Sequence, residues 1–467
     1  MRRNKLWLLL VALVLIVPLT TCAPKPTPAP TRTPTPAPEV APKPTPTPIP
    51  EEVPAPAPTP TREAAAKFQL LDYNMFLQRG DLRIVGIIEN TGDAASRLDT
   101  KALRLVDASG NVVAEPSPTT LELIAPGQKS PLKAEIYEHQ GIPEKWQELE
   151  VRLEEEGYPV DLIFEEYIPL EAENLASKAF ETQAEGEPGI YGVSGWITNN
   201  AKSPTERPTV LVTGYDAWGK LVDVVSTCPH PEYLNPGISA PFIATLSMVE
   251  PIVTYEVFAQ GEVVEPSNLV ELEIADYSIV GPDRRGETHF LGEVVNRGSA
   301  LAVETRVVIA LVTEQGEVVD IDFTIGSAVS LAPGDRLPCK LSSYAPQEWW
   351  DKPVFLVQGF MEDSLSDTYT GVYTDLKLEG LNTLGEKYGR YCLTGQISNT
   401  GESEAEVDVL AALYDAKGKV IDVAGHRLWS WDFGPGSSET LELTFSVEVE
   451  EEVASFKVFY GGLASRY

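Results

Sequence analysis

The stretch YCLTGQISNTG, residues 391–401, decides the fold that we expect for this chain. Its apolar residues Tyr391, Leu393 and Ile397 recur at every second or fourth position, and mostly polar residues lie between them. An alternation with a period of two residues predicts a β-strand that buries one face. The strand then runs into Asn399-Thr400-Gly401, which suits a tight turn because Asn and Gly tolerate positive φ.

The same pattern occurs four times in the chain. The four matching segments are Gly86-Ile87-Ile88-Glu89-Asn90, Gly195-Trp196-Ile197-Thr198-Asn199, Gly292-Glu293-Val294-Val295-Asn296 and Gly395-Gln396-Ile397-Ser398-Asn399. About 20 residues after each Asn comes a turn glycine, and a Pro-Gly pair follows it; the turn glycines are Gly110, Gly219, Gly316 and Gly418. The first glycines of the four segments are 97–109 residues apart. This period is the size of a domain, so we expect tandem domains and not a solenoid.

Each repeat is predicted to be an antiparallel β-sandwich of the immunoglobulin-like type. The segments 107–110, 216–219 and 415–418 each begin with Asp and end with Gly, which favours hairpin loops. Short strands with turns every ~8–12 residues are typical of sandwiches. The expected fold class is therefore all-β, with repeats over residues 67–168, 169–265, 266–374 and 375–467.

The fourth repeat resembles the FxLYD family of bacterial extracytoplasmic domains. The resemblance rests on Leu413-Tyr414-Asp415-Ala416-Lys417-Gly418-Lys419-Val420 together with residues 395–401, although Ala411 stands where the family has Phe. The second repeat keeps Tyr215-Asp216, while the third has Thr313 in place of the Asp and matches by spacing. The resemblance implies an immunoglobulin-like fold and a location outside the cytoplasm, and it implies no catalytic residue.

The N-terminal segment, residues 1–22, reads as an export signal. Three positive charges precede an apolar run of about 14 residues, which is shorter than the ~20 that span a bilayer as a helix. Leu19-Thr20-Thr21-Cys22 resembles a bacterial lipobox, except that Thr21 replaces the usual small residue. The resemblance implies lipidation of Cys22. An ordinary secretory signal and an uncleaved anchor remain as alternatives, and all three place the body outside the cytoplasm.

A linker rich in proline and threonine, residues 23–66, follows the signal segment. Proline fixes φ and removes backbone donors, so we expect a stiff polyproline II stalk. The body beyond it is acidic, since the chain holds 36 Lys and Arg against 69 Asp and Glu. This charge argues against nucleic-acid binding, which needs a cationic face. We also expect the like charge of neighbouring repeats to keep them from packing closely together.

Cysteine and histidine are too few and too scattered for familiar chemistry. Cys228, Cys339 and Cys392 fall one each in repeats two to four, so none can form a disulfide within its own sandwich. We expect Cys339 to be a buried core thiol, and Cys392 to be reachable because it lies on the strand face opposite the core. No catalytic triad, zinc motif or phosphate loop is present. We predict no enzymatic activity, no cofactor and no metal site of a known type.

Two weaker candidates for ligand binding remain. The alternating carboxylates of Glu402, Glu404, Glu406 and Asp408 share one strand face, and they are either a solvated face or a divalent-cation site. Exposed tryptophans favour sugar stacking, and the candidates are Trp196, Trp218 and Trp429. By alignment with the other repeats, Trp431 and Phe433 are expected in the core, and Trp349-Trp350 are expected to plug one end of the third sandwich.

Two hypotheses for the function follow from these patterns. The first is a non-enzymatic, membrane-anchored envelope protein that acts as an adhesion module, a spacer or an interaction scaffold, with an envelope protein or cell-wall component as partner. The second is a ligand-binding lipoprotein that takes a glycan on exposed Trp or a divalent cation on the acidic strand face.

Overall fold

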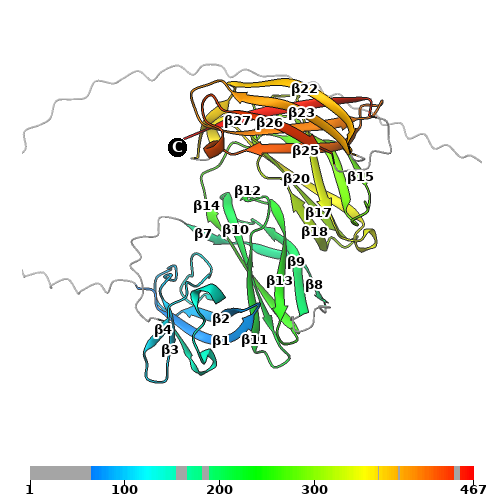
Figure 1. Ribbon diagram of the computed structural model, residues 1–467. Helices are drawn as coiled ribbons and strands as arrows, with labels where there is room; N and C mark the ends of the chain where they lie inside the picture. The colour runs from blue at the N-terminus through cyan, green and yellow to red at the C-terminus, as the bar shows by residue number, and fades with distance from the viewer. Residues whose placement is uncertain are drawn as a thin grey trace, which may run out of the picture. The chain divides into compact units, whose positions relative to one another are not determined.

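A computed structural model describes residues 65–153, 166–180, 189–365, 368–387, 390–445 and 453–466. The predicted lipidation site Cys22 and almost all of the predicted linker lie outside these ranges. Residues Arg62–Tyr467 form one compact unit. In the described ranges the chain is nearly all β-strand, and its few helices are 3-10 turns of three residues (Figure 1). The expected all-β fold is confirmed.

Every repeat consists of two antiparallel sheets. In the first repeat the sheets are β1(Phe68–Gln78)–β2(Asp81–Asn90)–β5(Lys129–Ile136) and β4(Val112–Ala114)–β3(Leu103–Val106)–β6(Glu150–Leu153). In the second repeat they are β8(Glu171–Phe180)–β9(Gly189–Thr198)–β13(Ser239–Met248) and β11(Leu221–Thr227)–β10(Thr205–Tyr215)–β14(Thr254–Val263)–β7(Tyr167–Pro169), with β12(Tyr233–Leu234) paired to β10.

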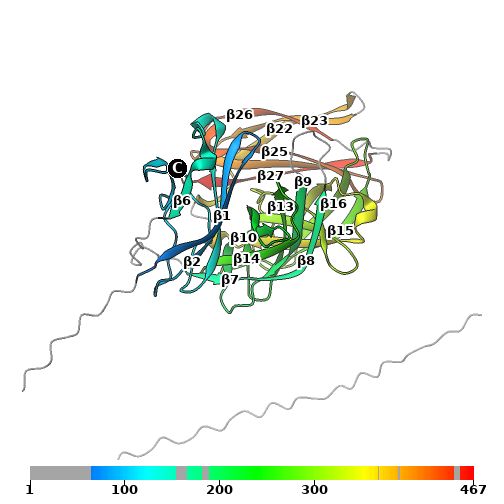
Figure 2. The same ribbon diagram turned by 90° about the horizontal axis from the view of Figure 1, so that it is seen from below.

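The third and fourth repeats follow the same plan. The third has β15(Leu272–Val280)–β16(Thr288–Asn296)–β19(Arg336–Ser343) and β18(Val318–Phe323)–β17(Val303–Val312)–β20(Lys352–Phe360). The fourth has β22(Leu376–Lys387)–β23(Arg390–Asn399)–β26(Ser438–Thr444) and β21(Tyr369–Tyr373)–β27(Ser455–Ser465)–β24(Ala405–Tyr414)–β25(Val420–Leu428). Figure 2 shows β15 and β16 of the third repeat and β22, β23 and β26 of the fourth. Because β21 pairs with β27, the fourth sandwich begins before the junction that was expected near residue 374.

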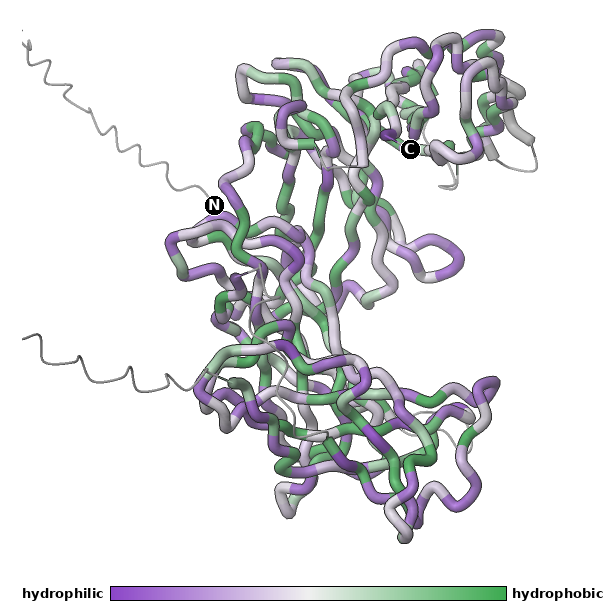
Figure 3. Tube along the Cα trace, turned by 90° about the vertical axis from the view of Figure 1, so that its left-hand side faces the viewer, coloured by the Kyte–Doolittle hydropathy of each residue, from purple (hydrophilic) through white to green (hydrophobic). Residues whose placement is uncertain are grey.

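Two names are useful for these sheets. We call the sheet that contains the strand ending at the repeated Asn the Asn sheet; its central strand is β2, β9, β16 or β23. The strand that leaves the Asp–Gly hairpin loop is the exit strand, and it is β4, β11, β18 or β25. The two sheets of each repeat enclose an apolar core, and hydrophobic and hydrophilic residues alternate along the strands (Figure 3). Neighbouring repeats add to two of these cores: Leu211 and Phe258 of the second repeat pack on the core of the first, and Leu410 and Phe459 of the fourth pack on the core of the third.

The repeated Asn is a buried cross-link. The amide nitrogen of Asn399 donates to the carbonyl oxygens of Ser403 at 2.9 Å and Phe433 at 3.1 Å, and its side-chain oxygen accepts from the backbone of Gly401 at 3.1 Å. Asn90, Asn199 and Asn296 make the same three bonds in their own repeats. None of the four Asn residues has positive φ, so that part of the expectation is wrong, but each side-chain oxygen accepts a hydrogen bond from the backbone two residues later, which is how Asn supports a turn. The residue satisfies backbone groups that would otherwise be buried without partners.

The hairpin loops behave as predicted. The carboxylate of Asp415 accepts hydrogen bonds from the backbone of Lys417 and Lys419, both at 2.8 Å, and these bonds lower the pKa of Asp415. The four turn glycines all have positive φ: 81° for Gly110, 77° for Gly219, 86° for Gly316 and 82° for Gly418. In the third repeat Thr313 takes the place of the Asp, and its hydroxyl accepts from the backbone of Glu317 at 3.2 Å.

Candidate functional site

The most regular feature of the compact unit is the contact between consecutive repeats. In each of three junctions, the exit strand of one repeat packs against the outer face of the preceding Asn sheet. At the first junction Leu221 and Val224 of β11 pack with Phe76, Val85 and Ile87. At the third, Val420 and Val423 of β25 pack with Leu291. The expectation that like charge keeps the repeats apart is therefore wrong, because apolar contacts and local opposite charges outweigh the net charge at these faces.

The second junction uses one of the predicted tryptophans. Trp196 lies on the outer face of β9, as its alternation predicted, but the next repeat covers it, and its indole nitrogen donates to the carbonyl oxygen of Gly316 at 3.1 Å. The hydroxyl of Ser194, two residues earlier, donates to the carbonyl oxygen of Val318 at 2.6 Å. Trp196 is therefore a half-buried junction residue whose indole nitrogen is already hydrogen-bonded to the next repeat.

Two of the four predicted acidic residues are buried at the third junction. Glu406 and Asp408 alternate along β24 and are 8% and 5% exposed. Arg427 of β25 bonds both oxygens of Asp408 at 2.7 Å and lies 3.3 Å from Glu406. Burial lowers the pKa of Arg427, but the hydrogen bonds and charge of Asp408 outweigh it, and the pKa is raised. Glu402 and Glu404 lie outside the strand, in the turn before it.

Arg427 also ties the fourth repeat to the third. Its guanidinium donates to the carbonyl oxygen of Gly326 at 2.6 Å, and Asp408 accepts from the backbone nitrogen of Ala328 at 2.8 Å. Glu406 and Asp408 thus hold an arginine and a neighbouring loop and are not a free cation site, whereas Glu402 and Glu404 are exposed to solvent. A buried pair of this kind fixes geometry, because removal of either partner would leave a charge without compensation.

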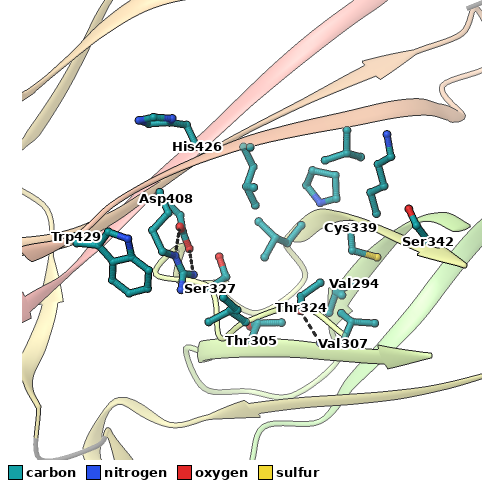
Figure 4. A pocket seen from close by; sticks show the side chains of 18 residues that line it. Val294, Thr305, Val307, Thr324, Ser327, Cys339, Ser342, Asp408, His426 and Trp429 are labelled. Carbon is teal, nitrogen blue, oxygen red and sulfur yellow. Dashed lines mark hydrogen bonds and ion pairs between the residues drawn. The ribbon is translucent and has the colours of Figure 1, made fainter. Parts of the chain in front are cut away.

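A hollow of about 560 Å³ lies at this junction (Figure 4). Its walls are largely apolar, and both the third and the fourth repeat contribute to them. Trp429 and His426 lie towards one side in the figure, and Cys339 and Ser342 lie towards the other. Thr305 also lines the hollow, and its buried hydroxyl has no hydrogen-bond partner among the described residues. The hollow offers apolar surface with a few polar groups, which is the usual composition of small-ligand sites.

A tryptophan pair stands at the edge of this hollow. Trp429 and Trp431 are stacked, with ring centroids 5.1 Å apart and an angle of 4° between their planes. Trp431 is 70% exposed, so its expected place in the core is wrong, whereas Phe433 is in the core as predicted. The 3-10 turn Ser430–Asp432 inserts into the strand pattern here and turns Trp431 outward. Trp429 is 37% exposed and was correctly predicted to be accessible.

The other tryptophans occupy contrasting places. Trp218 is 88% exposed at the hairpin tip of the second repeat, as predicted. Trp350 is buried against Phe290, which fits its expected role as a plug. Trp349 differs from that expectation, because it is 44% exposed and the ammonium group of Lys178 lies 4.0 Å from its ring.

The three cysteines are free thiols. Cys339 is buried as predicted, and burial raises its pKa to about 12. Cys392 was expected to be reachable but is buried, because Glu442 and Thr444 on the neighbouring strand β26 lie over it at 3.7 and 3.8 Å from its sulfur. Cys228 is exposed in the segment that follows β11.

Comparison with known proteins adds no family to this description: the chain matches no model of a protein family and no curated protein. Within the described ranges, no helix has the length and apolar character required to cross a bilayer.

Proposed function

We propose that the protein is a non-enzymatic, membrane-anchored envelope protein whose β-sandwich repeats act as a spacer and an interaction scaffold. The observation that carries this proposal is the junction that occurs three times, in which each exit strand packs on the preceding Asn sheet. A chain of domains joined in this way holds its surface loops in fixed relative positions. The lipobox resemblance at Cys22 and the proline-rich linker supply the anchor and the stalk.

Fractionation and protease treatment of intact cells test the anchored display. The wild-type protein should appear in the membrane fraction and be cleaved by added protease, and Cys22→Ala should move it to the soluble extracytoplasmic fraction. A wild-type protein that stays in the cytosol, or a Cys22→Ala protein that stays in the membrane, would contradict the proposal.

Chemical cross-linking in intact cells tests the scaffold role. An envelope protein or wall fragment should be recovered with the wild-type protein, and less of it should be recovered with Val423→Asp, which disrupts the third junction. Recovery of no envelope component, or equal recovery with both proteins, would contradict a role that depends on the fixed array.

The tryptophan pair favours a second candidate function, binding of a glycan. Trp429 and Trp431 present parallel aromatic surface beside the apolar hollow, and the guanidinium of Arg427 lies 5.5 Å from the ring of Trp429. Aromatic faces of this kind suit the apolar side of a sugar ring.

Titration with cell-wall oligosaccharides tests this candidate through intrinsic tryptophan fluorescence. We expect a saturable change that Trp431→Ala abolishes. Trp218→Ala is the control, because Trp218 is even more exposed than Trp431 but has no stacked partner ring among the described residues, and it should leave binding unchanged. No change at millimolar oligosaccharide, or an equal loss in both variants, would exclude binding at the pair.

A further inference from the structure

The turn between β15 and β16 of the third repeat gathers a set of side chains that the proposed function does not use. These side chains are Asp283, Glu287 and His289, and their potential ligand atoms all lie within 4.8 Å of one another. The aligned strand position of His289 holds Arg83, Gly192 and Cys392 in the other repeats. The group therefore occurs once in the part of the chain that the structure describes.

His289 provides the observation that distinguishes this group from an ordinary acidic turn. The residue is 3% exposed, and its Nε2 atom has no hydrogen-bond partner among the described residues. That atom faces Oδ2 of Asp283 at 3.8 Å, which is too long for a hydrogen bond. A buried nitrogen without a partner costs free energy unless something binds it.

The other ring nitrogen of His289 is held in place. Its Nδ1 lies 2.9 Å from the hydroxyl oxygen of Ser342, and the backbone nitrogen of Ser342 donates to Asp322 at 2.7 Å. If Nδ1 carries the proton and donates to Ser342, the lone pair of Nε2 points at the carboxylates. Histidines that bind metals are oriented in this way, by a hydrogen bond from the ring nitrogen that does not bind the ion.

The two carboxylates are also fixed by the turn. One oxygen of Asp283 accepts from the backbone of Arg285 at 2.8 Å and of Glu287 at 3.0 Å, and this leaves the other oxygen towards His289. Glu287 accepts a long bond of 3.3 Å from the hydroxyl of Tyr344. The bonds to Asp283 preorganise the turn, so an ion entering between the three groups would need only small side-chain movements.

The surrounding charge does not prevent binding of a cation. Lys340 is close enough to lower the pKa of His289, to which burial makes the largest contribution. Its ammonium group is itself paired with Asp422 at 2.8 Å. The positive charge of Lys340 is therefore compensated by a carboxylate.

We propose that Asp283, Glu287 and His289 bind one divalent transition-metal ion of the Zn²⁺ class. A neutral imidazole with carboxylates suits such ions, whereas Ca²⁺ requires six to eight oxygen ligands. Ligands at 2.0–2.2 Å around a tetrahedral ion lie about 3.4 Å apart, so the 3.8 Å between His289 and Asp283 needs only a small contraction. Three protein ligands leave a fourth position to water.

Competition between the chain and a chromogenic chelator for Zn²⁺ tests the proposal. The full chain, freed of metal by a chelator and kept reduced, should bind one more Zn²⁺ than Asp283→Asn/Glu287→Gln and one more than His289→Ala. The double variant changes only partly exposed residues of a turn, so it keeps the test valid if His289→Ala fails to fold. Because every comparison is a difference, zinc bound by Cys22 or Cys228 cancels.

Two further variants distinguish Zn²⁺ binding at this site from non-specific binding by other histidines. His139→Ala removes an exposed histidine of the first repeat and should bind Zn²⁺ as the wild type does. Ser342→Ala should weaken binding by about 10- to 100-fold, because it removes the group that orients His289. Equal zinc uptake by wild type, double variant and His289→Ala would overturn the proposal, as would uptake of no zinc at 100 µM free ion, a concentration at which such a site is expected to fill.

Side-chain nuclear magnetic resonance of the four histidines gives an independent reading. Zn²⁺ should shift the ring signals of His289 and leave those of His139 unchanged. Equal shifts of all four histidines, or a shift of His289 in the double variant that matches the wild type, would contradict the assignment.

Discussion

The exit strands of the first and fourth repeats have the same place in the fold but opposite surroundings. In the fourth repeat, Val420, Asp422 and Val423 of β25 are buried beneath the Asn sheet of the third repeat. In the first repeat, Val112 and Val113 of β4 are 48% and 45% exposed. The difference lies in what covers the strand, because the hairpin loops that lead into the two strands are the same.

The covered and the exposed exit strands also differ in sequence at one position. The position of Asp422 is Asp223 in the second repeat and Asp320 in the third, but it is Ala114 in the first. At two junctions this Asp is paired with a base of the preceding repeat, since Asp223 lies 3.6 Å from Arg83 and Asp422 lies 2.8 Å from Lys340. An Asp at this position of the exit strand therefore distinguishes the three repeats that pack on a preceding repeat from the first repeat. The outer face of β23 in the fourth repeat carries the polar residues Thr394, Gln396 and Ser398.

The largest effect is expected from a charge placed in a covered exit strand. Val420→Asp should destabilise the fourth repeat by about 3 kcal/mol or more, because it buries an unpaired carboxylate among apolar side chains. Val112→Asp is the matched control on the exposed strand and should change stability by no more than about 0.5 kcal/mol. Urea unfolding followed by tryptophan fluorescence measures the free energy of unfolding of both variants. Similar losses in the two would show that packing of the preceding repeat on the exit strand makes no difference to its tolerance of charge.

A second prediction concerns the buried ion pair of the third junction. Lys340→Ala should cost about 3 kcal/mol, because Asp422 is fully buried and would lose its cation. Lys377→Ala removes an exposed ion pair with Glu379 and should cost less than about 1 kcal/mol. Thermal unfolding of the two variants checks the comparison, and a Lys340→Ala protein as stable as Lys377→Ala would contradict it.

The pH dependence of the first junction gives a smaller effect. Burial raises the pKa of Asp223 above its ordinary value of 3.8, and the hydrogen bond from Ser247 and the charge of Arg83 oppose this only in part. The folded state therefore binds more protons than the unfolded state above pH 3.8, so this residue lowers stability as the pH rises through its raised pKa. Melting temperatures of wild type and Asp223→Asn between pH 4 and 7 should diverge, with the wild type losing relative stability as the pH rises. Parallel curves would contradict the raised pKa.

The smallest effect is expected when the Asp of the other exit strands is introduced into β4 of the first repeat. Ala114→Asp gives β4 the Asp of the other exit strands, but no preceding repeat supplies a base. Ala114 is half-buried and packs against the core of the first repeat, so the loss in free energy of unfolding should be about 1 kcal/mol in the same urea titration. A loss of 2 kcal/mol or more would mean that β4 is covered in solution.

Much of the fold of each repeat could be predicted from local patterns. Alternation identified the central strands of the Asn sheets, and the hairpin and Pro-Gly glycines have the positive φ that their turns require. The Asn cross-link was missed because its partners, such as the carbonyl oxygen of Phe433, lie some 34 residues away in sequence. The sequence did contain one sign of it, because the Asn and this carbonyl partner are 34 or 35 residues apart in all four repeats.

The junctions and sites depended on contacts that no local pattern contains. Val85 and Ile87 make the outer face of β2 apolar, and this was a visible sign that something covers it. Arg427 faces Asp408 only through the register of β24 and β25. The spacing of Asp283, Glu287 and His289 was present in the sequence, but the burial of His289 that gives it meaning comes from the tertiary structure.

The reactivity of introduced cysteines reports whether each exit strand is covered by the repeat before it. In a Cys22→Ser/Cys228→Ser background, a cysteine is placed at Val112 and at the aligned positions Leu221, Val318 and Val420, and each protein is treated with a thiol reagent under native conditions. We expect Val112→Cys to react at the rate of an exposed thiol and the other three to react at least about 100-fold more slowly. Equal rates at all four positions would contradict the claim that each repeat docks its exit strand on the one before it.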